Sequence, residues 1–202
     1  MSTIAEQLAD LYARLGHECY GEGVTLLEHS LLTAQAAERA GASDHLVVAC
    51  LLHDIGHLLE ESDDAYGVHD HGDVSGDYLA RYFPASVSEP ARLHVAAKRY
   101  LCATDAEYTA VLSEASRYTL EKQGGPMSSA ERREFEANPY HREGVRLRRW
   151  EDMAGKQRGT RSPDWSHFHP LLERLAGSQE SSDRTSSTSR SRRGATTADS
   201  TG

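Results

Sequence analysis

Apolar residues recur along most of the chain at the three- and four-residue spacing of an amphipathic helix. Ile4, Leu8, Leu11 and Leu15 give the first example, and Gly16 ends it. Sustained two-residue alternation of β-branched residues, which would predict strands, is not found. The pattern therefore predicts an all-α fold, with helices over residues 4–15, 26–40, 44–60, 71–82, 90–102, 106–112, 114–122, 128–137, 141–155 and 165–175.

Polar residues and helix breakers mark several of these boundaries. Ser43 is placed to cap the helix that follows it, and Ser128 with Glu131 has the spacing of a capping box. Pro84 is expected to close the helix over residues 71–82. The run 124–126, Gly-Gly-Pro, separates the first seven predicted elements from the rest.

The chain of 202 residues is long enough for one domain and an additional segment. After Leu175 the sequence contains Ser, Thr, Arg and Gly but no large apolar residue. Such a segment cannot bury enough surface to offset the entropy lost on ordering. We expect a single domain over residues 1–176 and a disordered polar tail over 177–202.

Charge and cysteine content narrow the class of protein. A net charge of −9 argues against nucleic acid as the main partner. The first residues lack the basic and apolar regions of a secretory signal, and no apolar run approaches the ~20 residues that span a bilayer. Three widely spaced cysteines suit reduced thiols. We expect a cytoplasmic protein that acts on a small molecule, with no membrane partner.

One stretch, residues 49–57, places polar chemistry inside an apolar helix. His53 and Asp54 follow a run of apolar residues, and His57 lies one turn after His53 on the same face. Burying an imidazole and a carboxylate is costly unless something pairs with them, and a metal ion is the usual partner. Because adjacent helical residues diverge by about 100°, His53 and Asp54 can reach two neighbouring ions.

Other histidines and carboxylates lie on or beside the apolar faces of different helices. A single inward histidine is more often a hydrogen-bonded core residue than a ligand. An ordered set of mixed nitrogen and oxygen ligands, one of them a carboxylate able to bridge, instead matches a dinuclear site for Fe, Mn or similar ions. The predicted ligands are His29, His53, Asp54, His71, His94 and Asp152.

The order of these ligands resembles the HD-domain superfamily of metal-dependent enzymes. A narrower resemblance, over residues 20–156, is to the HD-domain diiron oxygenases that cleave C–P bonds. It is carried mainly by His94-Val-Ala-Ala-Lys-Arg-Tyr-Leu101 and by Ser116-Arg-Tyr-Thr-Leu-Glu-Lys-Gln-Gly-Gly-Pro-Met127, which are long and particular, and also by residues 20–29 and 51–57.

This resemblance implies an HD-domain helical bundle and a non-heme diiron oxygenase that takes part in phosphonate catabolism. It implies two iron ions as Fe(II)/Fe(III), with O2 as co-substrate. The substrate would be 2-amino-1-hydroxyethylphosphonate or its trimethylammonium analogue, and the products phosphate and glycine or glycine betaine. The residues that match the family's phosphonate-binding positions are His57, Lys98, Ser116, Thr119 and Arg149.

Two segments depart from the family's pattern. The family's Tyr-x-Gly-Glu loop, which gates the open iron site, is Tyr20-Gly21-Glu22 here, so that either Tyr20 or Cys19 takes the place of the family's tyrosine, with Glu22 beside it. The last ligand and its neighbouring arginine are Glu151 and Arg148 if aligned on Trp150, or Asp152 and Arg149 if aligned on Lys156. We choose the second pair because Lys156 then stays on the face of the ligand.

Other functions remain open at this point. The main alternative is an HD-type metal-dependent phosphohydrolase acting on a phosphate ester or a nucleotide, which would use the same ligands. A non-catalytic HD module predicts missing ligands, whereas all six positions can be filled here. The sequence leaves the N-substituent of the substrate and the oligomeric state undecided.

Overall fold

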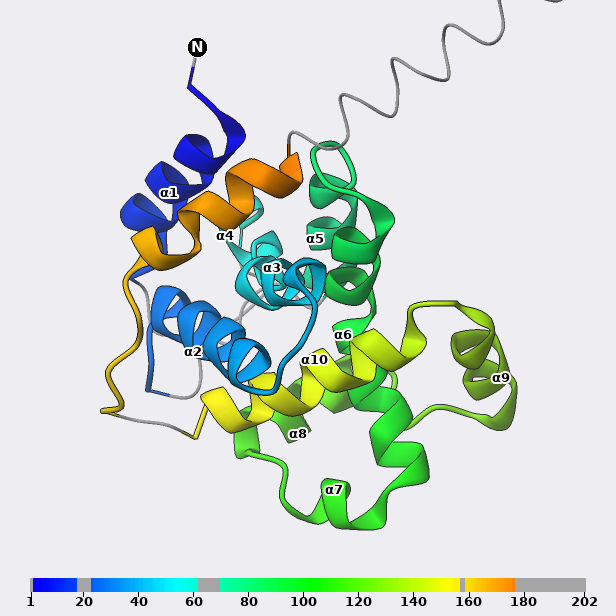
Figure 1. Cartoon of the computed structure of the whole chain (residues 1–202). Coiled ribbons are helices and arrows are strands. Elements are labelled where there is room, and N and C mark those ends of the chain that lie inside the picture. The colour runs from blue at the N-terminus through cyan, green and yellow to red at the C-terminus, as the bar shows by residue number, and fades with distance from the viewer. Residues whose placement is uncertain (1, 18–22, 62–69, 157–158, 177–202) are drawn as a thin grey trace, which may run out of the picture.

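A helix that is apolar on every side lies at the centre of the fold (Figure 1). The computed structural model describes residues 2–17, 23–61, 70–156 and 159–176. Helix α3 (Asp44–Leu52) is capped by the Ser43 side chain, as the sequence predicted, and its residues 46–52 are all buried. Only a helix surrounded by other elements can be apolar all round.

The other helices follow the predicted order. In the described part of the chain their bounds are α1 Ile4–Leu15, α2 Leu26–Arg39, α4 Gly56–Leu59, α5 His71–Leu79, α6 Ala85–Thr104, α7 Ala106–Ala110, α8 Glu114–Lys122, α9 Ser129–Ala137 and α10 His141–Ala154, with a further helix over residues 165–176.

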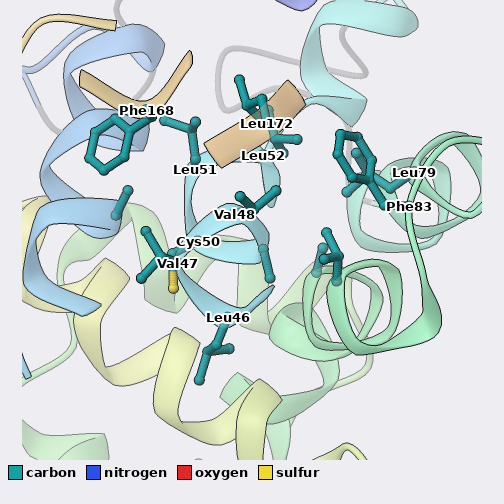
Figure 2. Packing of buried hydrophobic residues seen from close by; sticks show 14 of the residues in the cluster. Leu46, Val47, Val48, Cys50, Leu51, Leu52, Leu79, Phe83, Phe168 and Leu172 are labelled. Atoms are coloured by element: carbon teal, nitrogen blue, oxygen red, sulfur yellow. The ribbon is translucent and has the colours of Figure 1, made fainter. Parts of the chain in front are cut away.

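Helices α2 and α6 pack on two sides of α3, and α10 crosses below it to contact both α2 and α6 (Figure 1). Helix α5 runs beside α6. Figure 2 shows side chains leaving α3 in several directions, with Leu79 and Phe83 on one side and Phe168 and Leu172 of the last helix on another. Metal-binding side chains that point inward from these helices would therefore meet at one end of α3.

The predicted all-α class is confirmed, since no strand occurs in the ranges that the structure describes. The predicted capping box of Ser128 and Glu131 forms at the start of α9. Among the described helices, none is long and apolar enough to cross a membrane. The predicted tail, 177–202, lies outside the described residues, so its disorder and the domain boundary at residue 176 stay predictions.

The prediction of one continuous helix over residues 44–60 is wrong, because the chain turns between α3 and α4. The N–H of Ile55 donates to the carbonyl of Leu52, three residues back, at 3.1 Å. The N–H of Gly56 donates to the Ser75 hydroxyl of α5 at 2.9 Å instead of continuing the α-helical ladder. The turn contains His53 and Asp54, so these two predicted ligands lie where the helix ends.

The predicted start of the next long helix at Pro90 is also wrong. Helix α6 begins at Ala85, with Pro84 as its N-cap, and Pro90 lies inside it. Pro90 is the sixth residue of α6, past the first four N–H groups that have no partner within a helix. Pro90 gives up one hydrogen bond, to the Ser86 carbonyl, and the helix continues past it.

Gly56 lets α4 approach the start of α5, and this approach carries a prediction. A Cβ at Gly56 would lie 2.4 Å from the carbonyl oxygen of His71, which is backbone and cannot rotate away. We expect Gly56→Ala to lower the free energy of unfolding by about 2 kcal/mol, as overpacking does. Because the displaced segment carries His71, the variant should also bind less metal, which thermal unfolding and metal analysis would measure.

Gly41→Ala is the matched control. Gly41 has a φ of +68° with open space around the added Cβ, so alanine there costs about 1 kcal/mol of backbone strain away from His71. The control should lose stability but keep its metal. Equal metal content in the two variants would contradict a role for Gly56 in placing His71.

Candidate metal centre

The carboxylate of Asp54 lies between two pairs of histidines. Its Oδ1 is 3.4 Å from Nε2 of His71 and 3.3 Å from Nε2 of His94. Its Oδ2 is 3.2 Å from Nε2 of His53 and 3.7 Å from Nε2 of His29. These five residues, called the His–Asp cluster below, give a carboxylate each of whose oxygens faces its own pair of imidazoles. This is the arrangement of a bridging ligand.

The members come from four separate segments of the bundle. His29 is on α2, His53 and Asp54 follow α3, His71 begins α5, and His94 is in the middle of α6. His53, Asp54 and His94 are almost fully buried. The buried cluster therefore depends on the packing of α2, α5 and α6 around the end of α3.

Backbone carbonyls set the tautomers of two of these histidines. Nδ1 of His53 lies 2.8 Å from the carbonyl oxygen of Cys50, and Nδ1 of His94 lies 2.6 Å from that of Ala91. A carbonyl can only accept, so each Nδ1 carries a proton and each Nε2 is the ring nitrogen that faces Asp54. Such a backbone partner is the usual way in which a metal-binding imidazole is oriented.

A second carboxylate, from Glu151 on α10, closes one side of the cluster. Its Oε2 is 3.9 Å from Nε2 of His53. The possible ligand atoms of His29, His53 and Glu151 all lie within 4.8 Å of one another, and the same holds for His53, Asp54 and His94. The two sets share His53, and the second contains the Asp54 carboxylate itself.

The geometry favours Glu151 over Asp152 as the last ligand. Asp152, chosen from the sequence, belongs to none of the groups of possible ligands among the described residues. Its Oδ2 accepts a hydrogen bond of 2.6 Å from the Tyr108 hydroxyl, and its Oδ1 pairs with Arg148. Helical geometry gives the reason, because Glu151 shares the inward face of α10 with Leu147 and Ala154 whereas Asp152 is rotated off it.

The choice of Glu151 also changes which arginine lies beside the last ligand. Arg149 is about half exposed and pairs with Asp105 at 2.8 Å, away from the cluster. Arg148 is buried, and its Nη1 donates to Oε1 of Glu151 at 2.6 Å. The alignment on Trp150, which the sequence analysis set aside, is the one that the geometry favours.

A metal ion fits the donor atoms found here. Nε2 of His53 and Oε2 of Glu151 are buried and make no hydrogen bond within the described residues, although buried polar atoms almost always have a partner. Nε2 of His71 and Nε2 of His94 are 2.9 Å apart. Two imidazole nitrogens bound at ~2.1 Å to one octahedral ion are ~3 Å apart, which matches this separation.

Burial shifts the pKa values of His29 and of Glu151. Burial lowers the pKa of His29 to about 3, against the opposing attraction of Asp54, so this imidazole is neutral and able to bind a cation. Burial also raises the pKa of Glu151, while Arg148 acts in the opposite direction. A bound cation would favour the charged form of the Glu151 carboxylate and would bind the lone pair of the neutral His29 imidazole.

Four polar residues from three helices lie next to the cluster: Lys98, Ser116, Thr119 and Arg148, called the anion subsite below. Nζ of Lys98 donates to Oγ1 of Thr119 at 2.7 Å, and Nη2 of Arg148 donates to Oγ of Ser116 at 3.3 Å. Burial, followed by the charge of Arg148, lowers the pKa of Lys98 to about 7. Two buried cations beside two hydroxyls suit an anion with several oxygens.

The remaining predicted residues are placed as follows. His57 is half-buried on α4 and stacks on His71, with ring centroids 4.0 Å apart, so it lies at the edge of the cluster. Its atoms, with those of Asp54 and His71, form a third group of possible ligands. Tyr20, Glu22 and Cys19 lie outside the described residues, and their gating role stays a prediction.

Tyr108 is the residue at this site that the sequence analysis did not single out. It lies on the short helix α7, and its hydroxyl contacts both Asp152 and Arg148. No motif marks a tyrosine at this position, so only the fold brings it to Arg148. Glu151, by contrast, could have been chosen from its spacing to Leu147 and Ala154.

Comparisons with known proteins show which family the chain resembles. Residues 26–124 match the HD domain family. A protein of Leisingera caerulea named [1-hydroxy-2-(trimethylamino)ethyl]phosphonate dioxygenase (glycine-betaine-forming) is 40% identical over 181 residues, which cover 85% of this chain and 90% of that protein. A hydroxymethylphosphonate dioxygenase of Gimesia maris is 41% identical over 179 residues, covering 85% of this chain and 89% of that protein.

Proposed function

The chain belongs to the HD-domain family of phosphonate dioxygenases, and from that premise we propose that it cleaves the C–P bond of a 1-hydroxyphosphonate with O2. As the C–P bond breaks, the carbon product gains one oxygen atom and the phosphorus product gains the other. The carbon bearing the hydroxyl becomes a carboxylic acid, and the phosphorus leaves as inorganic phosphate. For the amino and trimethylammonium substrates the acids are glycine and glycine betaine.

The observation that carries this proposal is the position of the anion subsite beside the His–Asp cluster. Arg148 joins the two, because its Nη1 donates to Glu151 and its Nη2 to Ser116. A phosphonate carries about two negative charges, which Lys98 and Arg148 would balance, and its oxygens would accept from Ser116 and Thr119. The adjacent carbon would then lie against the cluster.

The hydroxyl on that carbon is the feature that the names of the two relatives share. The amine is not shared, since one name contains a trimethylamino group and the other only a hydroxymethyl group. We therefore propose the 1-hydroxyphosphonate unit as the part that the subsite recognises. The substituent beyond it is the variable to be tested.

For the cofactor we propose two iron ions, Fe(II) and Fe(III). His29, His53 and Glu151 would hold one, His71 and His94 the other, and Asp54 would bridge them. When bound, such a pair supplies the electron transfer and the open coordination positions that a reaction between O2 and a C–H bond requires.

The protein's own residues would position and protect the substrate. Lys98 and Arg148 fix the phosphonate, so that the reacting carbon stays in one place, which is worth several kcal/mol of barrier in general. His57, at the edge of the cluster, would donate to a phosphonate oxygen. Tyr20 and Glu22, outside the described residues, would cover the open position until substrate binds.

Oxygen uptake tests the proposal. Iron-loaded protein should consume one O2 for each phosphate released from at least one of three compounds, which carry an aminomethyl group, a trimethylammoniomethyl group or hydrogen on the hydroxylated carbon. The same compound without its hydroxyl should give neither product. Phosphate release under argon at the aerobic rate would indicate a phosphohydrolase and would contradict the proposal.

A further inference from the structure

Arg148 is held on the side away from the cluster by two residues that touch no possible ligand. Its Nε donates to the Tyr108 hydroxyl at 3.0 Å and to Oδ2 of Asp152 at 3.3 Å. Its Nη2 pairs with the other oxygen of Asp152. The Tyr108 hydroxyl also donates to Oδ2 of Asp152 at 2.6 Å. The three side chains therefore form a closed set of hydrogen bonds around one edge of the guanidinium.

A count of donors shows what this set achieves. A guanidinium has five N–H bonds in a fixed fork. Nε uses its N–H on Tyr108 and Asp152, and Nη2 uses its two on Asp152 and Ser116. Nη1 uses one on Glu151. Among the described residues this leaves one N–H of Nη1, next to the one that contacts Glu151, for a ligand.

Tyr108 is itself fixed by packing that is separate from the main core. Its ring lies in a small apolar cluster with Leu101, Leu112 and Leu120, which come from α6, the segment after α7, and α8. The side chain of Asp105 caps α7 by accepting from the backbone N–H of Tyr108 at 3.0 Å. The hydroxyl is thus carried on a rigid support, and Asp152 is aligned by it.

We propose that Tyr108 and Asp152 are positioning residues that hold Arg148 in the orientation in which it contacts Glu151 and binds the phosphonate. The inference rests on the proposed function for the identity of the anion. Without the Tyr108 hydroxyl, Nε would keep only its longer contact, of 3.3 Å, with Asp152, and Asp152 would lose the hydrogen bond that aligns it with the guanidinium. The remaining N–H of Nη1 would then have a less fixed direction.

The test compares Tyr108→Phe with Tyr100→Phe. Tyr100 is a matched control, because its hydroxyl also donates to a carboxylate, Glu136, at 2.9 Å, on the surface between α6 and α9. The probe is inorganic phosphate, titrated calorimetrically into iron-loaded protein. We expect Tyr108→Phe to weaken phosphate binding about tenfold, the usual effect of losing a hydrogen bond to a charged group, and Tyr100→Phe to leave it unchanged.

Kinetics separate positioning from general damage. With a hydroxyphosphonate substrate, Tyr108→Phe should raise KM about tenfold while kcat and iron content stay near the wild-type values. A lower Tm with the same phosphate Kd as wild type would overturn the proposal, because it would show a structural role only. Absence of phosphate binding by the wild type would overturn it too.

The two proposals fail in different ways. A wild-type protein that binds phosphate through Tyr108 but consumes no O2 would refute the dioxygenase reaction and leave the positioning role in place. A wild-type protein that consumes O2, with Tyr108→Phe equal to Tyr100→Phe in both phosphate Kd and KM, would refute the positioning role alone.

Discussion

Replacing His94 with alanine is expected to reduce turnover by more than about a hundredfold and to lower the iron content well below two ions per chain. His94 is fully buried, and its Nε2 lies 3.3 Å from Oδ1 of Asp54 and 2.9 Å from Nε2 of His71. Even residues that only orient a ligand cost 10- to 100-fold when changed, so loss of the ligand itself should cost more. Iron analysis and O2 uptake measure the two effects.

His141→Ala is the control for this variant. Nδ1 of His141 lies 2.8 Å from the carbonyl oxygen of Asn138, three residues back, which reproduces the local contact of His94 with Ala91. His141 is at the start of α10 and in no group of possible ligands among the described residues. It should keep full iron and activity. Two ions and wild-type turnover in His94→Ala would contradict the proposed centre.

Glu151→Gln and Asp152→Asn form the second decisive pair. The two residues are neighbours on α10 and carry the same charge, so each change removes one negative charge at nearly the same place. Of Glu151 and Asp152, only Glu151 belongs to a group of possible ligands with His29 and His53. We expect Glu151→Gln to lose iron from one position and to lose activity by about a hundredfold, since a neutral amide is a weaker ligand.

Asp152→Asn should instead retain both ions per chain, because Asp152 contacts Arg148 and Tyr108 and no histidine of the cluster. Iron content measured on the purified, iron-loaded variants separates the two residues without reference to activity. Loss of iron from Asp152→Asn, with full iron in Glu151→Gln, would restore the ligand that the sequence first suggested.

The fold was predictable where a helix depends on its own residues. Helices α1 and α8 have the predicted bounds because the apolar spacing and a flanking glycine or polar cap define them locally. The central position of α3 also follows from sequence, since its residues are apolar in every direction. These features need no knowledge of the neighbouring helices.

The bounds of a helix could not be predicted from its own residues where a contact with another helix determines them. The turn at His53–Ile55 depends on the Ser75 hydroxyl, which accepts from the N–H of Gly56, and Ser75 is in another helix. Local propensity predicts a continuous helix there. The start of α6 differs from the prediction because a proline is typical of the first turn of a helix, whereas Pro90 is the sixth residue of α6.

The candidate site shows the same division. His29, His53, Asp54, His71 and His94 were predicted as one set, and the structure brings them together around the Asp54 carboxylate. The choice between Glu151 and Asp152 depended on one helical step, and the face shared with Lys156 was a poor guide. Lys156 is exposed and contacts the carbonyl of Val111.

The central claim is that the Asp54 carboxylate joins two metal ions, and anomalous scattering at the iron edge from crystals of the iron-loaded protein tests it most directly. The account predicts two peaks about 3.5–4 Å apart, one on each side of Asp54, with Glu151 next to the peak that His29 and His53 bind. A single peak, or two peaks that Asp54 does not separate, would contradict it.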